Sequence, residues 1–148
     1  MQTFWLLVAA SAGILIPVQA AVNSKMRAYV GQPLYATLIN FGVGMVFLAV
    51  VLTLIPAANE GGSWRRSADA PWWAWTGGVL GLVFVTATVV VVRYTGQASF
   101  SVAMLTGQTI GALALDHFGW LGTETREINP SRLLAVGLLV IAVWLMQR

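Results

Sequence analysis

Five long stretches without a charged side chain constrain this chain more than any other feature of its sequence. They cover residues 3–22, 34–55, 72–92, 98–115 and 133–147, and every Asp, Glu, Lys and Arg lies outside them. A helix rises 1.5 Å per residue, so about 20 apolar residues cross the roughly 30 Å of hydrocarbon in a bilayer. Because a charged side chain is costly in lipid, this segregation predicts five membrane-spanning helices.

The overall composition agrees with a lipid environment. Of the 148 residues, 58% are hydrophobic and only 9% are charged, and the mean hydropathy is +0.79. A soluble domain carries about 25% charged residues, which it needs to cover its surface. The five stretches are continuously apolar, whereas the strands of a membrane barrel alternate apolar and polar residues. We therefore expect an all-α polytopic membrane protein, with one transmembrane domain over residues 1–148.

The residue types that several functional classes require are scarce. The chain has no cysteine and one histidine, and no stretch contains a pair of carboxylates. Neither a nucleophile with its base nor a set of metal ligands is recognisable, so we expect no enzyme, no metal and no cofactor. The net charge of +3 is spread over the connecting segments. It predicts neither a nucleic-acid partner nor a strongly basic patch at the membrane surface.

Amide side chains interrupt the first two stretches. Gln19 and Asn23 are four residues apart and share a helix face. They follow Pro17, which can bend a helix and free a backbone carbonyl. Asn40 lies deep enough in the second stretch to need a hydrogen-bond partner there, since lipid offers none. Such amides either line a polar path or hydrogen-bond neighbouring helices and headgroups, and both alternatives fit these residues.

The stretch 98–119 combines an apolar run with a polar stripe. Ser101, Gln108 and, beyond the apolar part, Asp116 recur at about seven to eight residues, so they lie near one line along a helix. Thr109 extends this line. A single glutamine in a span often hydrogen-bonds a neighbouring helix, but the whole stripe favours a pathway.

The pair Asp116 and His117 marks the predicted exit of this helix. A histidine and the following Gly119 suit a helix C-terminus, but an aspartate does not, so Asp116 should have a partner. The candidate partners are His117, Arg126 and Arg132. The pair is either an interfacial cap with an ion pair or a gate that responds to protons, because histidine changes charge near neutral pH.

Glycines inside the stretches predict close packing of helices. Small residues on a helix face let the backbone of a neighbouring helix approach. The predicted packing positions are Gly42, Gly44, Gly77, Gly81, Gly107 and Gly111.

The connections between the stretches predict how the helices pair. Residues 56–71 form the longest hydrophilic segment and predict a flexible loop. Only residues 93–97 separate the third stretch from the fourth, so these two helices should be antiparallel neighbours. The pattern Tyr-x-Gly-Gln precedes both the second and the fourth stretch, at 29–32 and 94–97. This short repeat suggests that these two helices occupy related positions.

The distribution of basic residues predicts no preferred orientation in the membrane. With five spans, one side carries Arg65, Arg66, Arg126 and Arg132, and the other carries Lys25, Arg27, Arg93 and Arg148. An imbalance of Lys and Arg normally orients a membrane protein, and here there is none. We therefore expect dual topology, in which copies insert both ways and pair as an antiparallel homodimer of ten helices. Such a dimer would recreate the inverted-repeat symmetry of secondary transporters.

Five short motifs, taken in order, resemble those of a known family. They are QAAVN at 19–23, NFGVG at 40–44, PWWAW at 71–75 before two glycines at 77–78, GQ at 107–108, and DHFG at 116–119. Over essentially the whole chain, the combination resembles the YdcZ-type five-helix exporters of the bacterial inner membrane, in the drug/metabolite transporter superfamily. The resemblance implies half of a ten-helix transporter fold, completed by a second copy or a paralogue.

The same resemblance implies a substrate cavity formed by the first four helices and a dimer contact through the fifth. Small exporters of the wider superfamily couple to protons through a membrane-embedded glutamate. No stretch of this chain contains an acid, which argues against that mechanism.

The residues and the resemblance together favour a small-molecule transporter that works by alternating access in the inner membrane. The predicted substrate path is lined by Gln19, Asn23, Asn40, Ser101 and Gln108. Their uncharged hydrogen-bonding groups suit a small polar or amphipathic solute. The alternative is a non-transporting assembly or scaffold subunit, in which the same amides and glycines serve packing alone.

Overall fold

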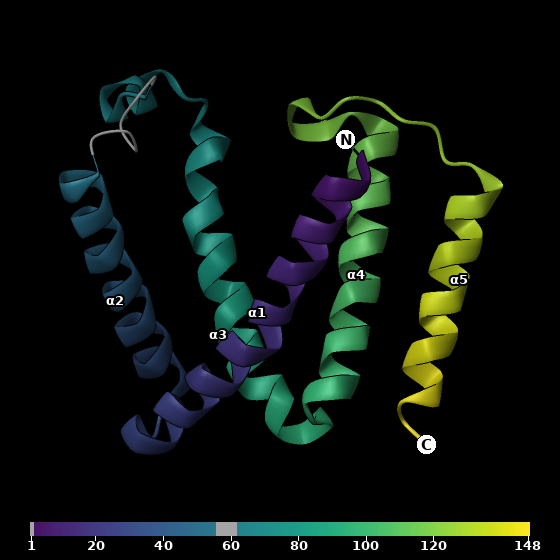
Figure 1. Cartoon of the computed structure of the whole chain (residues 1–148), viewed down its shortest axis with the longest axis horizontal. Coiled ribbons are helices and arrows are strands. Elements are labelled where there is room, and N and C mark those ends of the chain that lie inside the picture. The colour runs from purple at the N-terminus through teal and green to yellow at the C-terminus, as the bar shows by residue number, and fades with distance from the viewer. Residues whose placement is uncertain (1, 56–61) are drawn as a thin grey trace. The chain divides into compact units, whose positions relative to one another are not determined.

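The computed structural model describes residues 2–55 and 62–148, and this part of the chain is helical with no strand. The all-α fold expected from the sequence is thereby confirmed. The elements are α1 (Gln2–Val30), α2 (Pro33–Leu54), the 3-10 helices η2 (Trp64–Asp69) and η3 (Trp72–Thr76), α3 (Gly77–Thr95), α4 (Gln97–Phe118), the 3-10 turn η4 (Trp120–Gly122) and α5 (Pro130–Leu145) (Figure 1). Of the predicted loop 56–71, residues 56–61 lie outside the described residues.

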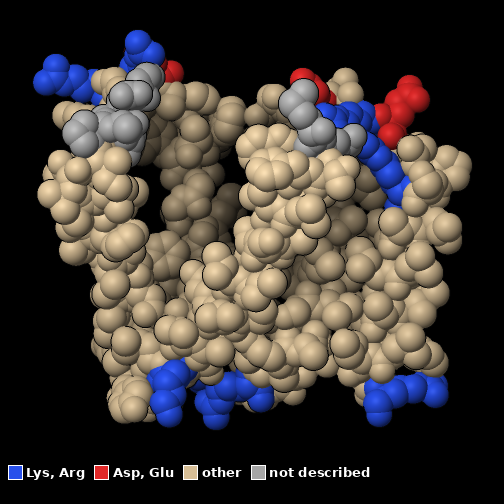
Figure 2. All heavy atoms as spheres, in the orientation of Figure 1, with Lys and Arg blue, Asp and Glu red and all other residues tan. Residues whose placement is uncertain are grey.

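Four of the described helical segments are long and apolar enough to cross a membrane. They are Thr3–Val30, Pro33–Leu54, Trp72–Thr95 and Gln97–Phe118. Only 6–17% of the residues in their most apolar windows are buried, so most of these side chains are available to lipid. Figure 2 shows the charged side chains at the ends of the helices and an uncharged surface between them. The protein is therefore a polytopic membrane protein.

The fifth helix is shorter than the other four. α5 has 16 residues, which at 1.5 Å per residue is about 24 Å. Its first turn begins at Pro130, where Asn129 caps the helix by accepting a hydrogen bond from the backbone N–H of Arg132 at 2.9 Å. Because this length is less than the thickness of the hydrocarbon, such a helix spans only where the bilayer thins around it or its flanking residues reach to the interface.

The helices differ from the apolar stretches mainly at their ends. α1 continues through Lys25 and Arg27 to Val30, because a helix backbone needs no lipid to persist. It ends at Gly31, whose φ of 76° is favourable only for glycine. The tryptophan-rich segment 72–76, expected within a span, is a 3-10 helix that leads into α3.

The chain forms two compact units, residues 1–93 and 94–148, and the border falls in the last turn of α3. In the first unit, α1 and α2 pack side by side, and polar contacts connect both of them to α3. The hydroxyls of Thr37 in α2 and Thr86 in α3 are 3.2 Å apart. The Arg27 guanidinium of α1 donates from Nη1 to the Val89 carbonyl of α3 at 3.3 Å. The buried apolar residues of this unit are Ala20, Ala36, Val85 and Val89.

In the second unit, α4 packs against α5 (Figure 1). α4 stops at Gly119, which adopts the left-handed conformation predicted for it, with φ 62°. A hydrogen bond of 2.8 Å from the Arg126 backbone N–H to the Asp116 carbonyl folds the connecting segment back onto α4. At the other end, the Ser99 hydroxyl of α4 donates to the Met146 carbonyl at 3.1 Å, just past α5.

Most serine and threonine side chains inside the α-helices bond to their own helix. Each of seven donates to the carbonyl four residues earlier, at 2.8–3.0 Å. They are Ser11, Thr37, Thr53, Thr88, Ser101, Thr106 and Thr109. Such a bond satisfies the hydroxyl inside lipid without a partner helix.

Candidate functional site

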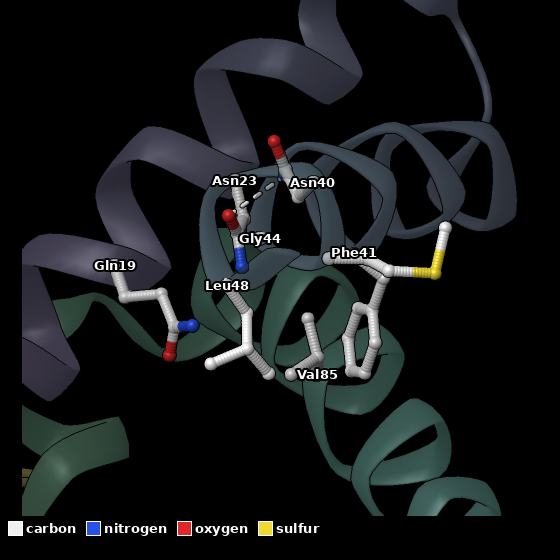
Figure 3. Close-up of a pocket in the computed structure, with 8 residues that line it drawn as sticks. Gln19, Asn23, Asn40, Phe41, Gly44, Leu48 and Val85 are labelled. Carbon is white, nitrogen blue, oxygen red and sulfur yellow. Dashed lines mark hydrogen bonds between the residues drawn. The ribbon is translucent and has the colours of Figure 1, made fainter. Parts of the chain in front are cut away.

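A cavity of about 380 Å³ lies in the first unit (Figure 3). We call it the amide pocket. Its residues are Gln19 and Asn23 of α1, Asn40, Phe41, Gly44, Met45 and Leu48 of α2, and Val85 of α3. Three of the five residues predicted to line a substrate path thus meet in one cavity.

A hydrogen bond joins two of these amides across the interface of α1 and α2. Asn40 donates from Nδ2 to Asn23 Oδ1 at 2.8 Å (Figure 3). Asn23 is only 4% exposed, and Asn40 is half-buried. The bond supplies the partner that an amide at this depth requires, since lipid supplies none.

The paired asparagines still have polar groups to offer. An amide carries one acceptor oxygen and two N–H donors, so one shared bond leaves capacity on both residues. In Figure 3 the Asn23 nitrogen and the Gln19 nitrogen point into the pocket, whereas the Asn40 oxygen points away from Leu48 and Val85. Gln19 is exposed and makes no hydrogen bond with the described residues. The pocket therefore presents hydrogen-bond donors along one edge.

The opposite wall of the amide pocket is apolar. Phe41, Met45, Leu48 and Val85 form it, and Gly44 leaves room because it has no side chain. Among the described residues that line the cavity, none is charged. Such a combination can bind a neutral molecule with both a polar and an apolar part. Among the described residues that line it, none is a nucleophile or an acid–base group.

The other two predicted path residues, Ser101 and Gln108, lie on α4 in the second unit. Ser101 is half-buried and donates to the Gln97 carbonyl of its own helix at 2.8 Å. Gln108 is exposed. Their participation in a path shared with Gln19, Asn23 and Asn40 stays a prediction.

At the end of α4, Asp116 forms an ion pair with Arg132, one of its three candidate partners. Its Oδ2 lies 3.8 Å from Arg132 Nη1, at the start of α5, and both side chains are about one-third exposed. His117 is exposed, and its ring meets that of Phe118 edge-on with 4.9 Å between centroids. Asp116 and Arg132 connect the two ends of the segment between α4 and α5, while a gating role for Asp116 and His117 stays a prediction.

Of the six glycines predicted to pack, one has a close neighbour among the described residues. A methyl group built on Gly81 would lie 3.8 Å from the Phe41 ring, across the contact of α3 with α2. A methyl group would meet no described atom within 4 Å at any of the other five, which are Gly42, Gly44, Gly77, Gly107 and Gly111. Gly44 opens onto the amide pocket, and the other four stay predicted packing positions.

The residues of the apolar half of the pocket were not predicted from the sequence. Asn40, Gly44 and Leu48 follow one another at four-residue intervals, so their common helix face could have been found from spacing alone. Phe41 and Val85 carry no such signal, because apolar residues occur on every face of α2 and α3.

Comparisons with known proteins agree with the architecture. The family model described as "Putative inner membrane exporter, YdcZ" matches residues 4–145. The chain is 29% identical over 138 residues to the inner membrane protein YdcZ of Escherichia coli (strain K12), which covers 93% of this chain and 91% of that protein. No solved structure matches the chain significantly.

Proposed function

The chain belongs to the YdcZ family of inner membrane exporters, and from this premise we propose that its substrate path runs through the amide pocket. The protein is a multi-pass protein of the inner membrane, in a family of transporters rather than enzymes. The observation that carries the proposal is the meeting of Gln19, Asn23 and Asn40 in one cavity between otherwise apolar helices. Polar groups at membrane depth commonly mark a solute pathway.

The proposed substrate is a small neutral molecule with a polar and an apolar part. The pocket nitrogens of Gln19 and Asn23 would donate to a hydroxyl, carbonyl or ether oxygen of the solute. Phe41 and Leu48 would contact its apolar part. A bare ion fits poorly, because no lining side chain offers it an opposite charge. From residue type and helix register, we propose that Ser101 and Gln108 add polar groups to the same path.

We propose that transport uses two chains in alternating access. In a single copy, Met45 is 70% exposed and Leu48 is 57% exposed, so the amide pocket lacks a cover on this side. A second copy or a paralogue would close it and complete a ten-helix transporter. The equal number of Lys and Arg residues on the two sides supports an antiparallel pair. Asp116 and His117 would act at the rim of the path as a gate.

The test is a transport assay in liposomes that contain only this protein. The substrate panel consists of radiolabelled neutral solutes that carry hydroxyl or amide groups. Gln19→Leu removes an amide of the pocket that makes no side-chain hydrogen bond with the described residues. We therefore expect the transport rate to fall at least tenfold while the fold is kept. Gln108→Leu should likewise abolish transport without loss of the folded dimer.

The matched control is Ser11→Ala, also in α1, whose hydroxyl bonds only to the Leu7 carbonyl of its own helix at 2.9 Å. It should transport normally. Full activity of Gln19→Leu, with the Ser11→Ala rate unchanged, would refute the pathway through the amide pocket.

The Asn23–Asn40 bond also favours a second candidate, a non-transporting assembly or scaffold subunit. An amide pair between two helices is sufficient to hold them together without any ligand. In that case the wild-type protein would transport none of the radiolabelled solutes, and Gln19→Leu would behave like the wild type in the liposome assay.

A further inference from the structure

A second cavity of the first unit lies apart from the amide pocket, where α1 and α3 end. It measures about 400 Å³ and shares no lining residue with the amide pocket. Its residues are Ser24, Arg27 and Ala28 of α1, Gly31 in the following turn, and Arg93 in the last turn of α3. We call it the basic hollow.

Two arginines from different helices face this hollow with unused donors. Arg27 is half-buried, and its bond from Nη1 to the Val89 carbonyl fixes the guanidinium at the wall. A guanidinium has several further N–H groups, so this single bond leaves most of them available. The Arg93 guanidinium is exposed and makes no hydrogen bond or ion pair with the described residues, and neither does the Ser24 hydroxyl.

Among the described residues of the first unit, no acidic side chain balances this charge nearby. Residues 1–59 and 70–115 contain no Asp or Glu. The described acid of the first unit, Asp69, precedes the opposite end of α3. Figure 2 accordingly shows blue side chains without red ones where α1 and α3 end. A favourable interaction with the helix dipoles accounts for one arginine in each last turn. It does not account for two arginines and a free hydroxyl around one cavity.

The depth of the basic hollow in the membrane indicates which class of ligand can reach it. The uncharged stretches end at residues 22 and 92, so Arg27 and Arg93 lie just beyond the hydrocarbon, at the level of the headgroups. Planar guanidinium groups bind phosphate oxygens through paired hydrogen bonds. We propose that the basic hollow binds the phosphate group of an anionic phospholipid between Arg27 and Arg93, with Ser24 donating a further hydrogen bond. This lipid site is independent of the proposed transport function.

The test uses the full-length protein in phosphatidylcholine nanodiscs that contain a minor fraction of phosphatidylglycerol. Native mass spectrometry of the released protein counts the lipids that remain bound. We expect wild-type protein to retain phosphatidylglycerol preferentially. Each of Arg27→Gln and Arg93→Gln should weaken this preference about tenfold, the effect of losing one hydrogen bond to a charged group.

Lys25→Gln is the matched control, because Lys25 lies on the same end of α1 but does not line the hollow. It should keep the preference. If Arg27→Gln fails to fold, Arg93→Gln still tests the site, since the exposed Arg93 side chain makes no hydrogen bond or ion pair with the described residues. An Arg93→Gln protein that retains phosphatidylglycerol like the wild type, or a loss of equal size in Lys25→Gln, would overturn the site.

A second arm separates the lipid from a soluble phosphate. Inorganic phosphate at millimolar concentration is added to the detergent-solubilised protein, and its thermal unfolding is compared with that after addition of phosphatidylglycerol. Stabilisation by the lipid alone supports the proposal. Equal stabilisation by inorganic phosphate, lost in Arg93→Gln, would reassign the hollow to a soluble ligand and overturn the lipid assignment.

Discussion

At the scale of single residues, the amides differ from most of the serine and threonine hydroxyls within the helices. Seven of these hydroxyls bond to their own helix backbone, as Thr106 does to the Val102 carbonyl at 2.8 Å. An asparagine or glutamine has more donors and acceptors than one helix can satisfy, so it needs another helix or a solute. Asn23 and Asn40 have each other, whereas Gln19 has no partner among the described residues. This difference predicts which amide contributes to stability and which to binding.

Asn40→Leu should destabilise the fold, because it leaves the buried Asn23 oxygen without a donor. We expect a loss of about 1 kcal/mol, typical of a hydrogen bond between membrane helices. The free energy of unfolding in detergent micelles measures it. The double variant Asn23→Leu/Asn40→Leu should recover part of the loss, since no buried polar group is then unpaired. Gln19→Leu should be neutral for stability, and equal losses in Gln19→Leu and Asn40→Leu would contradict this division.

Gly119→Ala should destabilise the end of α4 for two separable reasons. The backbone has φ 62°, and an added methyl group would lie 2.7 Å from Thr125 Cγ2. The left-handed conformation alone costs an L-residue about 1–2 kcal/mol. Gly122→Ala isolates that cost, because Gly122 has φ 82° and open space around the added methyl group. The unfolding temperature of Gly119→Ala should therefore be lower than that of Gly122→Ala. A higher unfolding temperature for Gly119→Ala would show that the Thr125 side chain moves aside at no cost.

At the scale of elements, the local signals at the termini of α4 were easier to predict than the contacts between helices. The sequence identified Gly119 as the stop of α4 and named Arg132 among the partners of Asp116, since both follow from local rules for helix termini. The repeated Tyr-x-Gly-Gln pattern also has a structural counterpart. Gly31 before α2 and Gly96 before α4 have φ 76° and 74°. These features depend only on nearby residues and therefore leave a trace in the sequence.

The contacts between helices cannot be recognised from the sequence in the same way. A soluble helix marks its buried face by apolar residues at intervals of three and four, but α2 has apolar residues on all sides. The sequence could therefore place Asn40 within α2 and yet not show that Phe41 faces Gly81, or that Val85 completes the pocket. In lipid, the orientation of a helix about its own axis is set by packing and a few polar bonds.

Asp116→Asn should test the gate without unfolding the protein. The 3.8 Å contact between Asp116 and Arg132 is about one-third exposed, so its loss should cost at most about 1 kcal/mol. If the pair acts as a gate, the transport rate in liposomes should change severalfold while the unfolding temperature stays nearly constant. Exchanging the two charges in Asp116→Arg/Arg132→Asp should restore the rate towards wild type. An unchanged rate in Asp116→Asn would remove the gate from the mechanism.

At the scale of the whole molecule, the net charge does not describe how acidic and basic residues are divided between the two sides of the membrane. The sum of +3 predicted no strongly basic patch at the membrane surface, and this stays a prediction. By topology, however, all five acidic residues belong to the connections that also carry four arginines. The other four basic residues have no acidic side chain on their side of the five expected spans. The basic hollow lies on that side, so local distribution and not net charge is informative in a membrane protein.

Arg65→Gln/Arg66→Gln should convert a dual topology into a single one. It changes the balance of Lys and Arg between the two sides from four against four to two against four. The side of Lys25 and Arg148 should then face the cytoplasm in nearly all copies. A reporter fused after Arg148 should be found on both sides of the membrane in the wild type and on the cytoplasmic side in the variant. A wild-type reporter on one side only, with no partner chain, would exclude the antiparallel homodimer.

The bond between Asn23 and Asn40 has a consequence for biogenesis. Helices whose hydroxyls are satisfied internally can partition into lipid one at a time as they emerge during synthesis. α1 carries an amide whose partner is synthesised 17 residues later, on α2. Lateral release of α1 alone would expose Asn23 to hydrocarbon, so we expect the insertion machinery to hold α1 until α2 arrives and to release the two as a hairpin.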